Sequence, residues 1–174
     1  MLNEKRITEA KSNFNSYLRE GLIKKEPFKS IIFETYMRNH RESLIVAEEL
    51  FKENKSSLWV IVTSYYSMFY IANAILYKLG YKIGSSLTHK VTADSLIFLV
   101  RNKLKERLIE DYEIASNDAI ILSSNIIQSY EYERTKRSVF QYETTEEIKK
   151  VKAQTSLNRA KEFSKEVEKL ILNL

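Results

Sequence analysis

The middle of the chain is apolar on every side of a predicted helix. No residue from Leu58 to Tyr77 is charged, and apolar or aromatic side chains fall all around a wheel of 3.6 residues per turn. A helix of this kind is buried, either in protein or in a bilayer. Polar residues interrupt the run at Thr63, Ser64, Ser67 and Asn73. Three tyrosines also lie in its middle, whereas membrane helices carry tyrosine at their ends. The pattern therefore predicts a buried core helix over residues 57–80 and no membrane span.

Amphipathic patterns on both sides of this helix supply the surfaces that cover it. Apolar residues recur at spacings of three and four, which is the period of a helix with one buried face. Gly21 and Gly80 are natural C-terminal caps, and Thr144 with Glu147 forms a capping box before the last run. The predicted helices cover residues 2–20, 28–53, 57–80, 89 to about 102, 115 to about 140 and 144–174. Residues 103–112 form either a separate short helix or a continuation.

Composition agrees with an all-helical protein. The 174 residues contain 3 Gly and 1 Pro, and Leu, Ile, Lys and Glu are abundant, as in helical bundles. No internal repeat, low-complexity tract or linker divides the chain. We predict one domain, residues 1–174, folded as an all-α antiparallel up-and-down helical bundle of four to five long helices with one or two short ones.

The net charge and the lack of cysteine say more about where the protein is located than about its function. The net charge is +5, and basic residues mostly alternate with acidic ones, which is typical of solvated helix faces. Such a charge permits contact with a phosphate backbone, although dedicated nucleic-acid binders concentrate their basic residues on one surface. The chain has no cysteine, and its start carries acidic residues and no apolar run, so no secretory signal is expected. We expect a cytoplasmic protein.

Motifs of the common enzyme classes are missing. The sequence has no glycine-rich phosphate loop, no HExxH pair and no GxSxG elbow. With 2 His and no Cys, neither a metal nor another cofactor is expected. His40 shares a helix face with Tyr36 and Leu44, so we interpret it as a partly buried residue bonded to its neighbours. His89 begins a helix that Thr88 is expected to cap. Free backbone N–H groups bind anions at such a position, and capping or local hydrogen bonding would also explain the residue.

The run YEYERTKRSVFQYE is the most polar part of an otherwise core-forming helix. Arg134, Arg137 and Gln141 are spaced by three and four residues, so they share one helix face, and Tyr130 lies one turn earlier. Arginines beside aromatic rings can bind a phosphate and stack on a base. Alternatively, the arginines pair with neighbouring glutamates on the surface. The spacing leaves both interpretations open.

Four segments follow one another in a recognisable order. The segment SYYSMFYIANAILYKLG is followed by a loop with THK, a long helix ending in ERTKRSVFQY and the helix EEIKKVKAQTSLNRAKEFSKEVEKLI. This order resembles the HEPN family (higher eukaryote and prokaryote nucleotide-binding domains). The likeness covers residues 36–172 and is clearest to the prokaryotic branch with a YYAMFY-like second helix and an R-x4-Y element. The residues that carry it are Ser64, Tyr65, Tyr66, Met68, Phe69, Tyr70, Ala72, Gly80, His89, Lys90, Arg137, Tyr142, Ala160 and Phe163.

This resemblance implies an antiparallel bundle of four or five helices, usually a homodimer and often encoded beside a minimal nucleotidyltransferase as a toxin and antitoxin pair. Active members of the family are metal-independent ribonucleases that use an arginine and a histidine four to six residues apart, brought together across the dimer. In this chain Arg137 is followed at the matching position by Tyr142, whose pKa near 10 makes it a poor base. No arginine precedes His40 or His89 at the required distance, so the usual ribonuclease motif is missing.

Three hypotheses about function follow. In the first, the protein is a dimeric binding module in which Arg134, Arg137, Tyr142 and His89 hold a nucleotide, RNA or a nucleotidyltransferase partner. In the second, it is an atypical metal-independent ribonuclease, in which His89 replaces the missing histidine and Arg137 stabilises charge in the transition state. In the third, it is one half of an obligate helical complex, which would leave a large apolar face on the isolated domain. We favour the first, and the sequence assigns no catalytic residue.

Overall fold

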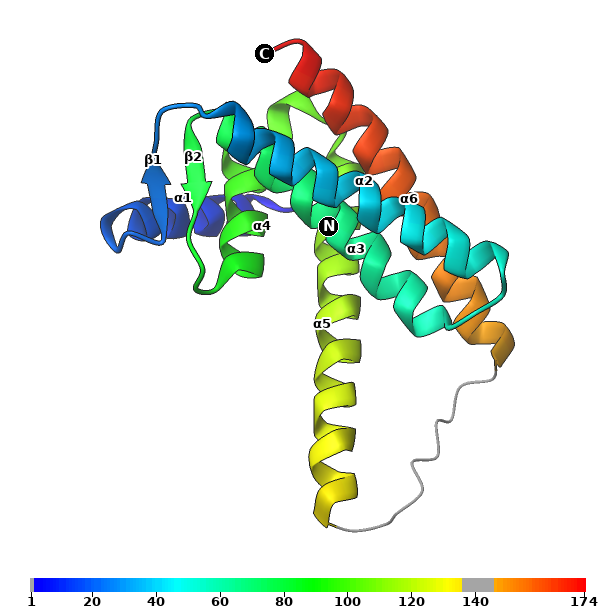
Figure 1. The fold of residues 1–174 in the computed structure, drawn as a ribbon. Helices are drawn as coiled ribbons and strands as arrows, with labels where there is room; N and C mark the ends of the chain where they lie inside the picture. The colour runs from blue at the N-terminus through cyan, green and yellow to red at the C-terminus, as the bar shows by residue number, and fades with distance from the viewer. Residues whose placement is uncertain (1, 136–145) are drawn as a thin grey trace.

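The fold is described from a computed structural model, which covers residues 2–135 and 146–174, with side chains for all of these except 124–135 and 146–148. In chain order the elements are α1 (Glu4–Arg19), β1 (Ile23–Lys25), α2 (Ser30–Lys52), α3 (Ser57–Lys78), β2 (Tyr81–Ile83), α4 (Thr88–Leu99), a 3-10 turn (Arg101–Lys103), α5 (Glu106–Thr135) and α6 (Glu146–Leu172). Figure 1 shows α2, α3 and α6 side by side, with α1, α4 and a small sheet at one end and α5 extending away from them. The predicted all-α bundle is confirmed.

Helix α3 is the core of the bundle, as its sequence predicted. Side chains on all sides of it are buried, among them Val60, Tyr65, Ile71 and Tyr77. Helix α2 packs against it in antiparallel orientation, and α6 covers a second side (Figure 1). Among the described helices, α3 alone is long and apolar enough to cross a membrane, and 67% of its most apolar window is buried. Its apolar surface is therefore covered by other parts of the protein.

The two ends of α3 follow from the sequence. Ser56 is its N-cap, because the serine hydroxyl oxygen accepts a hydrogen bond from the Trp59 backbone N–H at 3.5 Å. The helix ends at Lys78, and Gly80 follows with a φ of 91°, a conformation that strains any residue with a side chain. The predicted start is confirmed, and the predicted end is the glycine that stops the helix.

A two-stranded sheet was not predicted. Strands β1 and β2 are antiparallel, with Ile23 opposite Ile83, Lys24 opposite Lys82 and Lys25 opposite Tyr81. Strands this short show too little alternation to be distinguished from a loop in the sequence. Beyond the sheet, the Gly84 N–H donates to the Leu22 carbonyl at 2.8 Å, and a Cβ at Gly84 would lie 3.1 Å from that oxygen. This close approach favours glycine and fixes the chain just before α4.

Other predicted boundaries need correction. Helix α4 begins at Thr88 instead of His89, and its N-cap is Leu87 instead of Thr88. Helix α5 begins at Glu106, so most of the stretch at 103–112 belongs to the long helix expected from residue 115. Val151 belongs to the apolar-periodic run from which the last helix was predicted, but it is 62% exposed near the start of α6. The predicted capping residue Thr144 lies outside the described residues.

Helix α1 is attached to α4 through a buried carboxylate. Asp94 of α4 is fully buried and accepts hydrogen bonds from the Tyr17 hydroxyl at 2.8 Å and from the Asn13 side-chain amide at 2.9 Å. Its second oxygen lies 2.6 Å from Nη1 of Arg6, and the same guanidinium bonds to Glu113 of α5 at 2.7 Å. This Asp94 cluster joins α1, α4 and α5, and it therefore fixes the orientation of α4.

Candidate functional site

Of the four residues predicted to bind a ligand, one has a described side chain. Arg134 lies near the C-terminal end of α5, in the part of that helix whose side chains are not described. Arg137 and Tyr142 lie outside the described residues. The candidate site is therefore built on His89, in the first turn of α4.

The chain enters α4 in a conformation that leaves the helix without a side-chain cap. Leu87, the N-cap residue, has a φ of 51° and a ψ of 27°, a left-handed conformation that residues with a side chain rarely adopt. The first helical bond runs from the Val91 N–H to the Leu87 carbonyl at 3.0 Å. The N–H groups of Thr88, His89 and Lys90 therefore lie at the positive end of the helix dipole without partners inside the helix. This end of α4 attracts anions.

Three aromatic rings of α3 surround the imidazole of His89. The ring centroids of Phe69, Tyr65 and Tyr66 lie 4.9, 5.5 and 6.1 Å from the imidazole centroid. Tyr65 is buried in the core, while Tyr66 and Phe69 are partly exposed. His89 therefore lies where the aromatic core of the bundle reaches the surface.

Tyr65 connects His89 to α5 through two hydrogen bonds. Its hydroxyl lies 2.6 Å from Nδ1 of His89, and Oγ of Ser116 donates a hydrogen bond to the same hydroxyl at 3.0 Å. Tyr65 and Ser116 are both buried, so water is excluded from this relay. Ser116 donates to the phenolic oxygen, and we assign the phenolic proton of Tyr65 to the bond with Nδ1 of His89. The neutral imidazole then carries its own proton on Nε2.

Burial sets the protonation of both partners in this relay. It lowers the pKa of His89 below its ordinary value of 6.5, because desolvation disfavours the imidazolium. It also raises the pKa of Tyr65, so the phenol stays protonated at neutral pH. The Nε2–H of His89 has no hydrogen-bond partner among the described residues. The arrangement therefore offers a donor for a ligand oxygen and does not offer a free basic nitrogen.

Aromatic and basic side chains extend the site outward from His89. The ring of Tyr70 lies 5.6 Å from that of Phe69 and 6.1 Å from that of Tyr66, and all three are partly exposed. Lys90, the next residue after His89, is exposed. Proteins that bind single-stranded nucleic acids combine rings that stack on bases with cations that neutralise phosphates. The surface beside His89 carries both kinds of group.

The second histidine has a structural environment. His40 is 2% exposed, and its Nδ1 lies 2.9 Å from the hydroxyl oxygen and 3.1 Å from the carbonyl oxygen of Ser67. Its Nε2 lies 3.6 Å from a carboxylate oxygen of Glu168. The prediction that His40 is bonded to its neighbours is confirmed, and the residue is buried more completely than expected.

The partners of His89 were missed by the sequence analysis. Tyr65 is 24 residues from His89 and 51 residues from Ser116, so no helical spacing connects the three. The one available signal was that Tyr65 and His89 both carry the resemblance to the HEPN family. Ser116 had no signal, since a serine within a long helix is unremarkable in sequence.

A family model described as the HEPN domain matches residues 33–170. The matched region begins in α2 and ends in α6, so it contains α3, α4, α5 and the relay from His89 to Ser116, while α1 and β1 lie outside it. No match to the chain was found among curated proteins or among solved structures. Because the family model covers most of the sequence and the helical fold agrees with it, the chain belongs to the HEPN domain family.

Proposed function

We propose that this HEPN domain binds RNA or a nucleotide at the N-terminal end of α4, and that it does so as a homodimer without cleaving RNA. Membership of the family supports a nucleotide- or RNA-related module, and HEPN domains commonly form homodimers and bind RNA. The observation that carries the proposal is the geometry of His89. Its imidazole is oriented by Tyr65, offers an Nε2–H donor, and lies beside partly exposed rings at an uncapped helix end.

The chemical groups that fit this surface are a phosphate and a base. A phosphate oxygen would accept a hydrogen bond from Nε2–H of His89 and from the free N–H groups of the first turn of α4. Lys90 would neutralise part of the phosphate charge. A base would stack on the partly exposed ring of Tyr66 or Tyr70.

The hydrogen-bond relay argues against the alternative of a ribonuclease. Activating the 2′-hydroxyl of RNA requires a base with a free lone pair, whereas Nε2 of His89 carries a proton and Nδ1 is engaged by Tyr65. Where active family members have an arginine and a histidine, this chain has Arg137 and Tyr142, and a phenol is a weak base at neutral pH. We therefore assign Arg134, Arg137 and Tyr142 to ligand contacts.

Helix α5 is the element that we assign to the homodimer. Figure 1 shows α5 extending beyond the rest of the bundle. The helix exposes Ile114, Ile120 and Ile121, which are 43%, 42% and 58% accessible in the single chain. A second copy would remove these side chains from water. A minimal nucleotidyltransferase, as the other member of a cytoplasmic toxin and antitoxin pair, is the further partner that we propose.

Binding and cleavage are measured on the same samples. The purified full chain is titrated into a fluorescently labelled single-stranded RNA, and anisotropy reports binding while a gel run in the presence of EDTA reports the length of the RNA. We expect saturable binding that weakens as salt rises, because phosphate contacts release counterions. The RNA stays intact. His89→Ala lowers the affinity about tenfold or more, since it removes the oriented donor.

Two lysine variants distinguish RNA binding at a defined site on α4 from non-specific attraction of RNA to a basic protein. Lys90→Ala removes a charge beside His89, whereas Lys52→Ala removes an exposed charge at the end of α2. We expect the first to weaken binding and the second to leave it nearly unchanged. Equal effects of both variants, or no binding by the wild-type chain, would contradict the proposal. Metal-free cleavage that disappears in His89→Ala would show that the protein is a ribonuclease instead.

A further inference from the structure

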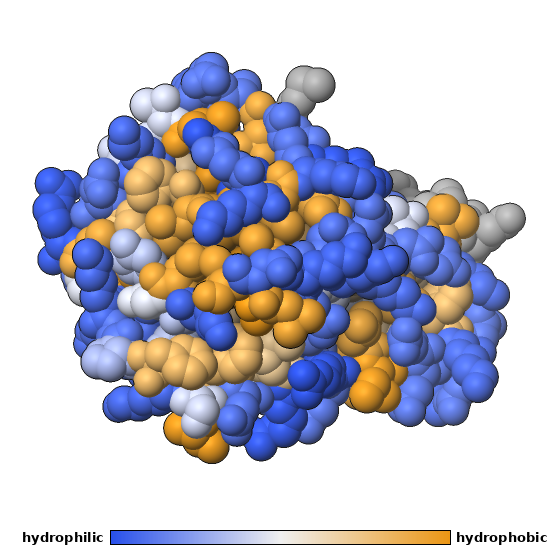
Figure 2. All heavy atoms as spheres, turned by 90° about the horizontal axis from the view of Figure 1, so that it is seen from above, coloured by the Kyte–Doolittle hydropathy of each residue, from blue (hydrophilic) through white to orange (hydrophobic). Residues whose placement is uncertain are grey.

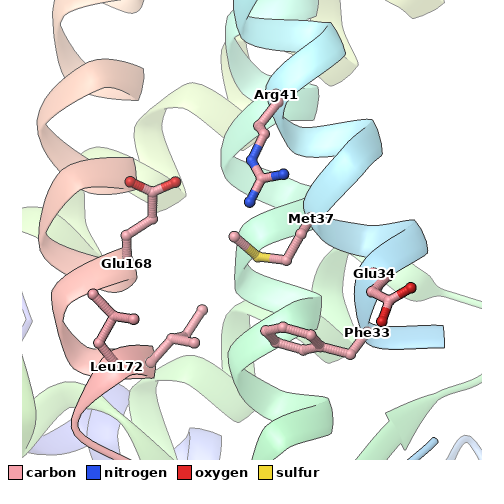
Figure 3. A pocket seen from close by; sticks show the side chains of 7 residues that line it. Phe33, Glu34, Met37, Arg41, Glu168 and Leu172 are labelled. Atoms are coloured by element: carbon pink, nitrogen blue, oxygen red, sulfur yellow. The ribbon is translucent and has the colours of Figure 1, made fainter. Parts of the chain in front are cut away.

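A cavity of about 380 Å³ lies between α2 and α6, and it shares no residue with the site at His89. Small-molecule sites in proteins have volumes of roughly 300 to 1,000 Å³ and combine an apolar lining with a few polar groups. This cavity has both kinds of wall (Figure 3). The residues that line it are Phe33, Glu34, Met37, Arg41, Glu168, Ile171 and Leu172.

A direct ion pair bridges α2 and α6 at one position along the two helices, but none among the described residues bridges them at this cavity. Lys161 of α6 bonds to Glu48 of α2 at 2.7 Å. At the cavity, Arg41 of α2 and Glu168 of α6 reach from opposite helices toward the space between them, as Figure 3 shows, without forming an ion pair. Two opposite charges therefore face one gap, and a molecule in the gap can contact both.

Each of these charges is available to a ligand. Arg41 is exposed and makes no ion pair with any other described residue. The Glu168 carboxylate is 45% exposed, and its contact among the described residues is Nε2 of His40, at 3.6 Å. Burial lowers the pKa of His40, so this imidazole is neutral at pH 7 and leaves the negative charge of Glu168 uncompensated. Opposite charges therefore stand at the two walls of the cavity.

The rest of the cavity is apolar and continues into an apolar surface. Figure 3 shows the side chains of Phe33 and Met37 from α2 and of Leu172 from α6 pointing into it. Leu172 is 84% exposed and Ile31, one turn before Glu34, is 67% exposed. Figure 2 shows hydrophobic side chains gathered on the face seen from above, with hydrophilic side chains around them. The apolar part of a ligand would leave water here.

We propose that this cavity binds a free α-amino acid with an apolar side chain. The ligand carboxylate accepts hydrogen bonds from the Arg41 guanidinium, the ammonium donates to the Glu168 carboxylate, and the side chain packs on Phe33 and Met37. A nucleotide fits poorly, because Glu34 and Glu168 repel phosphates and, among the residues that the structure describes, a single arginine faces the cavity. The proposal thus adds a second ligand site to the domain and stands independently of RNA binding.

Isothermal titration of the full chain with L-leucine tests this site. Three related compounds each lack one of the recognised groups: L-leucine amide lacks the carboxylate, N-acetyl-L-leucine lacks the ammonium and glycine lacks the side chain. We expect saturable binding of L-leucine and binding about tenfold weaker or more for each of the other three, since each loses one contact. Equal binding of L-leucine and its amide or acetyl derivative, or no binding of L-leucine, would overturn the proposal.

Variants then connect any binding to this cavity. Arg41→Ala and Glu168→Gln each remove one charged contact, and we expect about a tenfold loss of L-leucine affinity in either. Arg38→Ala is the matched control, because Arg38 lies on the same helix and faces Glu42 in the solvent, outside the cavity. Circular dichroism checks that all variants fold. Leucine binding unchanged in both cavity variants, or weakened equally by the control, would exclude this cavity. We expect RNA binding by the same variants to stay at the wild-type level. The proposals for the two sites are therefore tested independently of each other.

Discussion

His89 differs from an ordinary surface histidine in which of its ring nitrogens is available. Tyr65 occupies Nδ1, so a ligand meets Nε2–H. The side chain of asparagine places an amide near the position of Nδ1, and that of glutamine places one near Nε2. We expect His89→Asn to keep the bond to Tyr65 and to lose about tenfold in RNA affinity, while His89→Gln retains most of it. Anisotropy titrations at one fixed salt concentration compare the two variants. Equal affinity of both variants would mean that Nε2–H does not contact the ligand.

His40 makes the stability of the fold depend on pH. Burial lowers its pKa in the folded state below the ordinary value of 6.5, so the unfolded chain binds the proton more readily. This contribution to stability is fully present above pH 6.5 and is lost as the pH falls through the lower pKa of the folded state. We expect the free energy of unfolding to fall below about pH 6.5 and to fall less steeply in His40→Gln. Urea titrations at several pH values measure the difference, and parallel curves would exclude this role for His40.

Local sequence predicted some of these residues and not others. The start of α3 after Ser56 was predicted because capping depends on residues within one helical turn. The cap position of Leu87 was not, since a leucine with positive φ has no signal in the local sequence. The bond between Tyr65 and His89 is also a tertiary feature, because it depends on how α4 crosses α3.

Helix α1 lies outside the part of the chain that matches the family, yet it is bonded to the centre of α4. Tyr17 donates to the buried carboxylate of Asp94 at 2.8 Å, and Asp94 is on the helix that carries His89. Removal of the Tyr17 hydroxyl leaves a buried anion with one donor fewer. We expect Tyr17→Phe to lower the free energy of unfolding by about 1.5 to 3 kcal/mol, the usual effect of losing a hydrogen bond to a charged group.

Tyr81→Phe is the matched control for Tyr17→Phe. The ring of Tyr81 packs against Phe14 of the same helix at a centroid distance of 5.3 Å, while its hydroxyl makes no hydrogen bond among the described residues. We expect its loss to change stability by less than about 0.5 kcal/mol. Urea unfolding of both variants gives the comparison. If the two variants are equally stable, the Asp94 cluster does not attach α1.

The helices were predicted better than the smaller elements because their signals are longer. The apolar run of α3 and the amphipathic run of α2 each extend over several turns, so the pattern averages out single exceptions. Strands β1 and β2 are three residues long, which is too short for a pattern of apolar and polar residues to be recognised. Val151 shows the reverse error, because it belongs to an apolar run in the sequence but lies on the face of α6 opposite to the buried Ala160.

The arrangement of the helices explains which features of the whole molecule could be predicted from the sequence. A single all-round apolar helix requires others around it, so a bundle built on α3 was predictable. The direction in which α5 leaves the bundle was not, because both an inward and an outward course agree with its mixed pattern. The cavity between α2 and α6 could not be predicted from the sequence either. It depends on a gap between Arg41 and Glu168, two residues that are far apart in the chain.

The exposed isoleucines of α5 give the test of assembly. Ile114 and Ile121 are seven residues apart, so they lie near the same side of the helix, where an introduced carboxylate would be buried by a second copy. We expect the wild-type chain to have the mass of a dimer by light scattering after gel filtration, and Ile121→Glu to have the mass of a monomer at the same concentration. Ile45→Glu is the control, because Ile45 is similarly exposed, at 51%, on α2. A wild-type monomer, or a dimer that survives Ile121→Glu and dissociates in Ile45→Glu, would show that α5 is not the interface. Since the proposed RNA-binding module is a homodimer, a monomeric Ile121→Glu variant is also expected to bind RNA more weakly.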